Sequence, residues 1–295
     1  MFTQILTVIA PVFLIAGLGY LWTRRGGSFD TATIGSLVMY IGSPCLVFSS
    51  LTKIHLDGEA FSAVLTASVA VIVGCLAAGS VLLLALRKSL PTFLPSLVHP
   101  NTGNMGLPLS LMAFGETGLA LAISYYFVNS VSQYTIGMSL SSGRFSPAML
   151  LRQPIIWSVL AALTWRYAGW AVPEFLAGTT QLLGNLVIPA MLLMLGNSLS
   201  RLHIADLGTA SLLAVARLGL GFGLGLLMIH VLHLEGAAAG VVILQASMPS
   251  AVFNYVFAER FGRQPEKVAA VILVSTVLSF ATLPLLVGFA IKLAQ

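Results

Sequence analysis

Residues 99–108 read His99-Pro100-Asn101-Thr102-Gly103-Asn104-Met105-Gly106-Leu107-Pro108. This segment cannot continue an α-helix, because proline lacks an N–H donor and glycine favours other backbone conformations. Yet it lies within 89–115, a run without Asp, Glu, Lys or Arg that is long enough to cross a bilayer. Irregular backbone at membrane depth is tolerated only where it is buried in protein or lines a cavity. The stretch therefore predicts a membrane helix that breaks at a binding site.

The composition of the whole chain supports a membrane protein. Of 295 residues, 58% are apolar and 8% are charged, and the mean hydropathy is +0.98. Soluble domains average about 25% charged residues, so this chain could not cover a water-exposed surface. The net charge of +5 comes from basic residues that punctuate apolar runs. These features exclude a soluble enzyme, a nucleic-acid-binding protein and a disordered chain, and the two cysteines suggest no disulfide framework.

Apolar runs divide the chain into ten predicted membrane spans. They are too long and too uniformly apolar for the strands of an outer-membrane barrel. Basic residues follow the first run and none precedes it, so we expect a retained helix and not a secretory signal. The ten runs are 1–23, 31–52, 60–86, 89–115, 117–143, 153–173, 175–200, 207–234, 236–258 and 268–291, of which 153–173 and 207–234 each contain one arginine.

Lysine and arginine counts predict the orientation, because cytoplasmic loops carry the excess of basic residues. Ten basic residues follow the odd-numbered spans and three lie on the other side. Both termini are therefore predicted to be extracytoplasmic, in a multi-pass protein of the plasma (bacterial inner) membrane. The ten residues are Arg24, Arg25, Arg87, Lys88, Arg144, Arg152, Arg201, Arg260, Arg263 and Lys267, against Lys53, Arg166 and Lys292.

Matched prolines point to an internal repeat. Pro44 and Pro189 are 145 residues apart, and Pro108 and Pro249 are 141 apart, so one offset relates both pairs. Prolines also kink ordinary membrane helices, but two pairs at one offset favour a duplication. Because five spans is an odd number, the second half would enter the membrane from the opposite side. Inverted repeats with paired broken helices are typical of transporters.

The predicted fold is therefore an all-α integral membrane protein of ten transmembrane helices. These form two inverted five-helix repeats, residues 1–143 and 144–295, in which helices 4 and 9 are broken and cross. Where half-helix ends converge, their free N–H groups make an anion site that needs no lysine. Asn101 and Asn104 could serve such a site or simply cap the half-helices. The predicted breaks involve Pro100, Gly103, Gly106, Pro108 and Pro249.

Two ionisable residues within the spans have alternative interpretations. Arg217 could attract anions, or it could reach the headgroups from the cytoplasmic end of its span or cap the second break, and we favour the latter pair. His99 could carry a proton or be structural, and a structural role is favoured. No metal-ligand pattern is present, and we expect no metal and no cofactor.

Several strings resemble the auxin efflux carrier family, which includes the plant PIN-formed carriers and bacterial malate and malonate permeases. Residues 100–109 are similar to the first crossover motif of that family, and 245–259 to the second. Residues 44–48 and 216–219 are weaker matches. Plant members often have a long hydrophilic loop after the fifth span, where this chain has only about Ser141–Pro147. The short loop fits a compact bacterial member.

The resemblance implies a scaffold of spans 1, 2, 6 and 7 that forms a homodimer, with spans 3–5 and 8–10 as a moving, elevator-type transport domain. It also implies that Asn101 contacts the substrate carboxylate and that Asn129 faces the same cavity. The full set of candidate substrate-binding residues is Asn101, Thr102, Asn104, Asn129, Gln133, Cys45, Gln245, Ser247 and Ser250.

The leading hypothesis is a carrier of small organic anions, such as malate, malonate or auxin-like acids, and not an enzyme. The alternative is a sodium-dependent, bile-acid-type anion symporter, although acidic side chains within the spans are lacking. An intramembrane enzyme would need paired acids or metal ligands, which the spans do not offer. A channel would show flux that does not saturate. The expected partners are the anion, the lipid bilayer and a second copy of the chain, but no nucleic acid.

Overall fold

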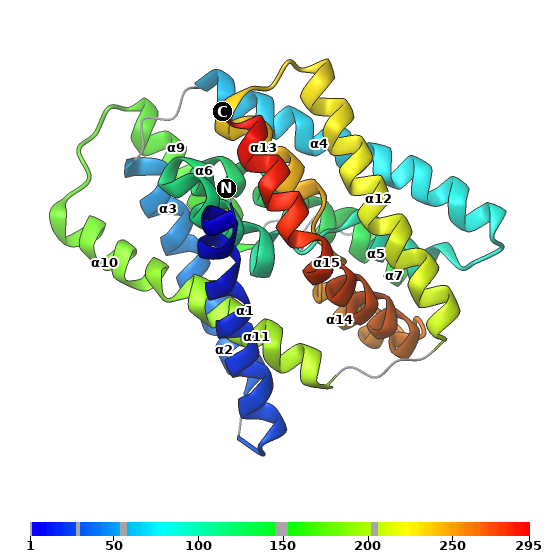
Figure 1. Ribbon diagram of the computed structural model, residues 1–295. Coiled ribbons are helices and arrows are strands. Elements are labelled where there is room, and N and C mark those ends of the chain that lie inside the picture. Colours follow the sequence, from blue (N-terminus) through cyan, green and yellow to red (C-terminus); the bar gives the residue numbers. More distant parts are fainter. Residues whose placement is uncertain (1, 28–29, 54–57, 145–152, 202–205) are drawn as a thin grey trace.

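A computed structural model describes residues 2–27, 30–53, 58–144, 153–201 and 206–295 (Figure 1). The described chain is helical throughout, and its only β-type pairing is one antiparallel bridge between Pro100 and Ser250. Arg152 and Pro147, which entered the predictions on orientation and loop length, lie outside the described residues.

The first half contains α1 (Phe2–Arg24), α2 (Thr31–Leu37), α3 (Ser43–Lys53), α4 (Gly58–Ala85), α5 (Leu90–Val98), α6 (Leu107–Ser132) and α7 (Met138–Ser142). Three five-residue π-helical segments join some of these helices, η1 (Val38–Gly42), η2 (Thr102–Gly106) and η3 (Gln133–Gly137). The second half contains α9 (Pro154–Tyr167), α10 (Glu174–Asn185), α11 (Val187–Arg201), α12 (Leu207–Val231), α13 (Gly236–Ala246), α14 (Phe253–Arg260) and α15 (Pro265–Leu293).

Seven helical segments in the described residues are long and apolar enough to cross a membrane. The ten predicted runs and these seven segments differ where helices are short or joined. The run 153–173 contains only α9, whose 14 residues are fewer than a bilayer requires. The run 236–258 is divided between α13 and α14. One segment, Thr102–Ser142, combines parts of two predicted spans.

That long segment turns sharply at Gly115. The φ of Gly115 is +63° and its ψ is −157°, which places it outside helical geometry within α6. A side chain would be strained at this φ, so glycine suits the position. The turn lies next to Glu116, the charged residue that separates two of the predicted spans.

Polarity is reversed relative to a soluble protein. Large apolar side chains are exposed along the outer helices, as at Leu14, Val81 and Leu285, whereas Asn129, Gln245 and Arg217 are buried. Such a surface suits lipid, while the interior holds the polar groups that lipid cannot solvate.

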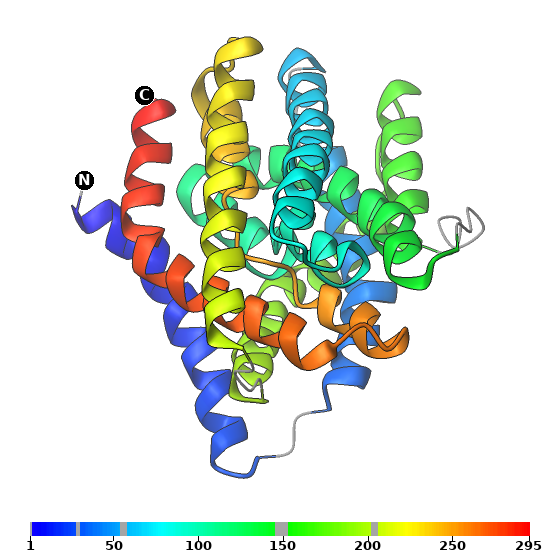
Figure 2. The same cartoon turned by 90° about the vertical axis from the view of Figure 1, so that its right-hand side faces the viewer.

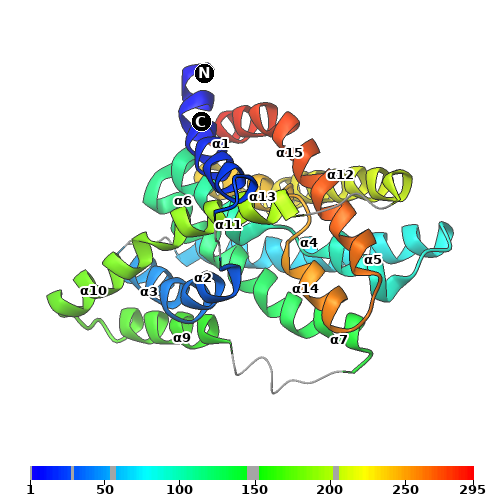
Figure 3. The ribbon, with the colours of Figure 1, turned by 90° about the horizontal axis from the view of Figure 1, so that it is seen from below.

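The helices pack as two groups. One group contains α1, α2, α3, α9, α10 and α11, in which α1 packs on α11 and α3 on α9 and α10. The other contains α4–α7 and α12–α15, in which α12 packs on α15 and α4, and α13 on α6. Figure 3 shows α3, α9 and α10 on one side of the molecule and α4, α5 and α12 on the other. Helices α4, α12 and the C-terminal part of α15 stand side by side in Figure 2.

Glycines allow the close contact between α1 and α11. A Cβ atom on Gly19 would collide with the carbonyl of Leu193, and one on Gly196 with the carbonyl of Ala16. Small residues at such crossings let membrane helices approach closely enough for their backbones to touch.

Outside the apolar segments, Asp206 caps the start of α12. Its carboxylate accepts a hydrogen bond from the backbone N–H of Thr209 at 3.2 Å. Hydrogen bonds from the Thr209 side chain and backbone lower the pKa of this exposed Asp206 carboxyl below its usual value.

Candidate functional site

The candidate site is built on the bridge between Pro100 and Ser250. The N–H of Asn101 donates to the carbonyl of Pro249 at 2.7 Å, and the N–H of Ala251 donates to the carbonyl of His99 at 3.0 Å. The residues between α5 and η2, and between α13 and α14, lie outside helices. Their backbone groups need partners in the interior, and the two stretches supply them to each other.

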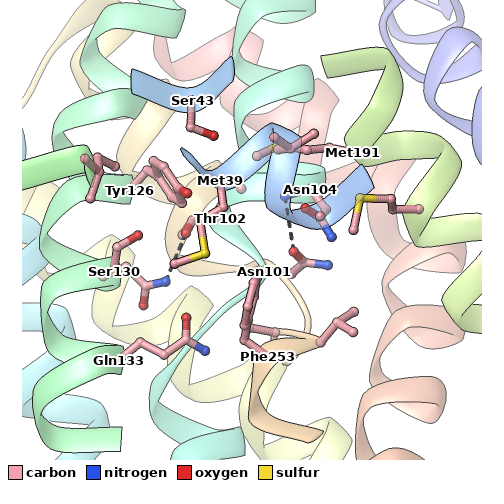
Figure 4. A pocket seen from close by; sticks show the side chains of 18 of the residues that line it. Met39, Ser43, Asn101, Thr102, Asn104, Tyr126, Ser130, Gln133, Met191 and Phe253 are labelled. Atoms are coloured by element: carbon pink, nitrogen blue, oxygen red, sulfur yellow. Dashed lines mark hydrogen bonds between the residues drawn. The ribbon is translucent and has the colours of Figure 1, made fainter. Parts of the chain in front are cut away.

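A cavity of about 470 Å³ lies beside this bridge, between the two groups of helices. One wall comes from α2, η1, the start of α3, α9 and α11, and the other from η2, α6, η3 and the start of α14 with the stretch that leads into it. Figure 4 shows 18 of the lining side chains around the same space and labels ten of them. None of the described lining residues is charged. From the predicted site the lining includes Pro100, Asn101, Thr102, Gly103, Asn104, Asn129 and Gln133.

Asn101 is both a helix cap and a free donor. Its Oδ1 accepts a hydrogen bond from the backbone N–H of Asn104 at 3.3 Å, at the start of η2 (Figure 4). Its Nδ2 is buried and has no hydrogen-bond partner. Buried polar groups are nearly always paired, so this amide is available for a ligand in the cavity it lines. The two interpretations of Asn101 therefore use different atoms of one side chain.

Asn129 on α6 holds the first half of the bridge in place. Its Nδ2 donates to the carbonyl of Pro100 at 3.2 Å and to Oγ1 of Thr102 at 3.0 Å. Its Oδ1 is buried without a hydrogen-bond partner. Asn129 thus positions the backbone at the cavity and presents an acceptor to the interior.

Asn254 links three segments and was missed by the sequence analysis. Its Nδ2 donates to the carbonyl of His99 at 3.3 Å and to Oγ of Ser250 at 3.1 Å. Its Oδ1 accepts from Nε2 of Gln133 at 3.0 Å. An asparagine five residues after Pro249, in an apolar run, was a signal in the sequence that could have identified it.

Other predicted residues lie outside the cavity lining. Nε2 of Gln245 donates to Oγ of Ser110 at 3.3 Å, and a Cβ atom on Gly106 would collide with the Gln245 side chain. The backbone N–H of Ser250 donates to Oγ of Ser275 at 3.2 Å. The hydroxyl of Ser247 is buried without a partner. Cys45, Pro108 and Pro249 are also absent from the lining.

Arg217 lies behind the bridge and has no solvent exposure. Its guanidinium donates to the carbonyls of Leu97 and Val98, at the end of α5, and to that of Ala246, at the end of α13. The suggestion that it reaches the headgroups is wrong for this reason. Capping is the role that the contacts show, and it extends to both helices. His99, which directly follows Val98, is fully buried, and neither of its ring nitrogens has a hydrogen-bond partner.

Sequence reasoning also missed many other residues of the cavity lining, on both walls. Methionines and aromatic residues inside apolar runs carry no local signal that separates a cavity wall from a packed core. These lining residues include Met39, Tyr40, Ser43, Tyr126, Ser130, Met191 and Met194. Within the described parts of the chain, no three His, Cys, Asp or Glu side chains are grouped so that they could hold a metal ion.

Comparison with known proteins identifies the class. A family profile described as membrane transport protein matches residues 4–147 and 138–287. An uncharacterized transporter of Methanothermobacter thermautotrophicus is 30% identical over 298 residues, which covers 95% of this chain and 96% of the relative. An uncharacterized transporter of Methanocaldococcus jannaschii is 23% identical over 272 residues, covering 85% of this chain and 87% of the relative.

The chain therefore belongs to the membrane transport protein family of the auxin efflux carriers. Its apolar helices and this family make it an integral, multi-pass membrane protein and a transporter.

Proposed function

We propose that this transporter carries small organic anions, carboxylates such as malate, malonate or auxin-like acids, as a secondary or potential-driven carrier. The observation that carries the proposal is the unpaired, buried Nδ2 of Asn101 in a cavity without charged lining residues. A neutral amide can bind a carboxylate without the desolvation cost of a buried lysine. A hydrogen bond to a charged partner contributes about 1.5–3 kcal/mol.

Helix N-termini support an anion over a cation. Helix η2 begins at Thr102 and α14 begins at Phe253, and both residues line the cavity. The first turn of a helix carries a partial positive charge from its aligned peptide dipoles, even where its N–H groups have partners, as those of Thr102, Asn104 and Asn254 do. Together with the Asn101 amide, these ends make a site for a carboxylate group. The methionine, tyrosine and phenylalanine side chains around it suit the rest of a small organic acid.

The packing of the helices supports an elevator-type mechanism. In this proposal α1–α3 and α9–α11 form the scaffold, which dimerises, and α4–α7 with α12–α15 form the moving group. The cavity lies between them, so movement of one group could expose the same site on either side of the membrane. The proposal includes ten passes in two inverted repeats, crossing breaks in the fourth and ninth, and both termini outside the inner membrane.

The membrane potential would favour export of an anion. Each negative charge that leaves an inside-negative compartment gains about 2.3 kcal/mol per 100 mV. No coupling ion is required for net transport in that direction.

Transport into proteoliposomes tests the proposal. Radiolabelled malate, malonate and indole-3-acetate are offered to the purified protein, with sodium or choline as the cation. We expect saturable uptake of at least one acid in either cation. Uptake that requires sodium would favour the symporter, unsaturable flux would favour a channel, and no uptake of any carboxylate would refute the anion proposal.

A further inference from the structure

Arg217 is a buried cation that has no counter-ion among the residues the structure describes. Its Nη1 lies 3.2 Å from the carbonyl oxygen of Val98 and 3.6 Å from Sγ of Cys75, and its other contacts are the carbonyls of Leu97 and Ala246. Arginine stays protonated in proteins. The carbonyls solvate its charge but do not neutralise it.

Acidic residues are distant from this guanidinium. Arg217 belongs to α12 and forms its hydrogen bonds with residues of α4, α5 and α13. These four helices contain one acidic residue, Glu59, sixteen positions before Cys75 on α4. Sixteen helical residues span about 24 Å. Asp206, which precedes α12, is eleven residues from Arg217, and Glu235, which precedes α13, is eleven residues from Ala246. Eleven helical residues span about 16 Å. The charge thus has no partner in its own surroundings among the described residues.

The same charge lies close to the cavity. Arg217 holds the carbonyl of Val98, and Pro100, two residues further on, lines the cavity. Two residues of chain span at most about 7 Å. The guanidinium is therefore behind the anion site and outside its lining, in the interior where charges are weakly screened.

Every contact of Arg217 belongs to one group of helices. Cys75 is on α4, Leu97 and Val98 are on α5, and Ala246 is on α13, all in the group that contains α12. Arg217 and Cys75 are also 142 positions apart, an offset within the 141–145 range of the paired prolines. Whatever movement this group makes, the charge moves with it.

From these contacts we infer that Arg217 is a counter-charge that travels with the anion. This inference rests on the proposed carriage of anions by a moving helix group. The empty carrier then moves one positive charge, and the carrier loaded with a monovalent anion moves none. The membrane potential acts on the return of the empty carrier, while the net charge moved in a full cycle is still that of the anion.

Exchange and net flux separate the two steps. In tracer exchange, with the same acid on both sides of the proteoliposome, only the loaded carrier needs to cross; net efflux also requires the empty carrier to return. Potassium gradients with valinomycin set the potential, and radiolabelled indole-3-acetate is the monovalent probe. A full charge moved through 100 mV shifts its distribution roughly 50-fold. We expect exchange to be independent of the potential and net efflux to depend on it.

Malate is the divalent probe. Its loaded carrier would move one negative charge instead of two, so exchange should respond to the potential as a single charge does. Potential-dependent exchange of indole-3-acetate, or malate exchange with the response of two charges, would overturn the inference. No flux of any acid would overturn the proposed function as well, so the two failures are distinct.

A carboxylate beside Arg217 should neutralise its charge and make the exchange of a monovalent anion depend on the potential. Cys75→Asp introduces an acid within reach of the guanidinium without removing its caps, and Cys75→Asn is the control of equal size. In Cys75→Asp, exchange of indole-3-acetate should become potential-dependent, while Cys75→Asn should retain the wild-type independence. Equal behaviour of two folded variants would contradict the inference. If Cys75→Asp does not fold, the wild-type comparison of exchange with net efflux decides alone.

Discussion

The backbone N–H of Asn101 donates a hydrogen bond to the carbonyl oxygen of Pro249 over 2.7 Å. Neither residue lies in a helix, and Ala251 returns a bond to His99 over 3.0 Å. The unpaired amide of Asn101 therefore projects from backbone that is fixed by the other half of the chain. The position of the Asn101 amide depends on both halves of the chain, so substitutions at Asn101 test the site directly.

Asn101→Asp removes the hydrogen-bond donor of this side chain and keeps the oxygen that caps η2. The carboxylate can still accept from the N–H of Asn104, but it has lost the Nδ2 donor and adds a negative charge. We expect a folded protein that no longer binds the anion proposed as its substrate. Asn101→Ala loses both functions and should weaken binding roughly ten- to a hundred-fold, at about 1.4 kcal/mol per decade. Radioligand binding and size-exclusion chromatography measure the two effects.

Asn104→Ala is the matched control for Asn101, because Asn104 contributes its backbone N–H to the cap and its side chain also lines the cavity. A smaller loss of affinity is expected. If Asn101→Asp binds the anion like the wild type, Asn101 is not the donor at the site.

Asn254→Ala should reduce stability more than Gln133→Ala. The Asn254 side chain makes three hydrogen bonds in the interior, to His99, Ser250 and Gln133, whereas Gln133 makes one of these. Leaving a buried partner unsatisfied costs about 1–3 kcal/mol. Thermal unfolding in detergent should show the lower midpoint for Asn254→Ala. Gln133 lines the cavity and Asn254 does not, so Gln133→Ala should lose more anion affinity relative to the stability that it loses. The reverse order of midpoints would contradict the bridging role of Asn254.

Gly19→Ala should loosen the contact between α1 and α11, and Gly17→Ala should not. The added methyl group at Gly19 collides with the carbonyl of Leu193, while nothing lies within 4 Å of a Cβ atom at Gly17. Overpacking costs about 1–3 kcal/mol. A lower unfolding midpoint is expected for Gly19→Ala alone. Equal midpoints for both variants would show that the two helices separate without cost.

A thiol at the C-terminus of the chain should react with reagents outside the cell. A cysteine at Gln295, in a background with Cys45 replaced by serine, should react with an impermeant thiol reagent in intact cells. A cysteine at exposed Arg87 should react only after permeabilisation. These outcomes follow from the excess of basic residues in the loops after the odd-numbered spans. Labelling in the opposite order would invert the proposed orientation.

Much of the fold follows from local features of the sequence. Apolar runs between charged residues predicted an all-helical membrane protein, and the described chain is helical with an apolar exterior. The charged Glu116 predicted a division of the chain where Gly115 turns α6. The number of long apolar segments could not be obtained this way, since helix length depends on breaks that tertiary hydrogen bonds stabilise, as between Asn101 and Pro249.

The sequence likewise predicted only part of the candidate site. Prolines, glycines and asparagines at 99–108 are unusual in an apolar run, so the sequence directed attention to Asn101 and Thr102, which line the cavity. Ser247 and Gln245 were equally polar but lie elsewhere, because the direction of a side chain is set by packing. Met191 and Met194, on a helix distant in sequence, became part of the wall only when α11 packed beside η2.

All three π-helical segments contribute to the cavity wall, through Met39 in η1, Gly103 in η2 and Tyr134 in η3. A π-turn contains one residue more than the α-turn it replaces. Removal of a single residue at any of these places would restore α-helical winding and rotate the neighbouring side chains by about 100°, the angle between successive residues of a helix. We therefore expect a one-residue deletion in η1, η2 or η3 to change which side chains face the cavity, and so to change which molecules fit it, without a change of any lining residue type.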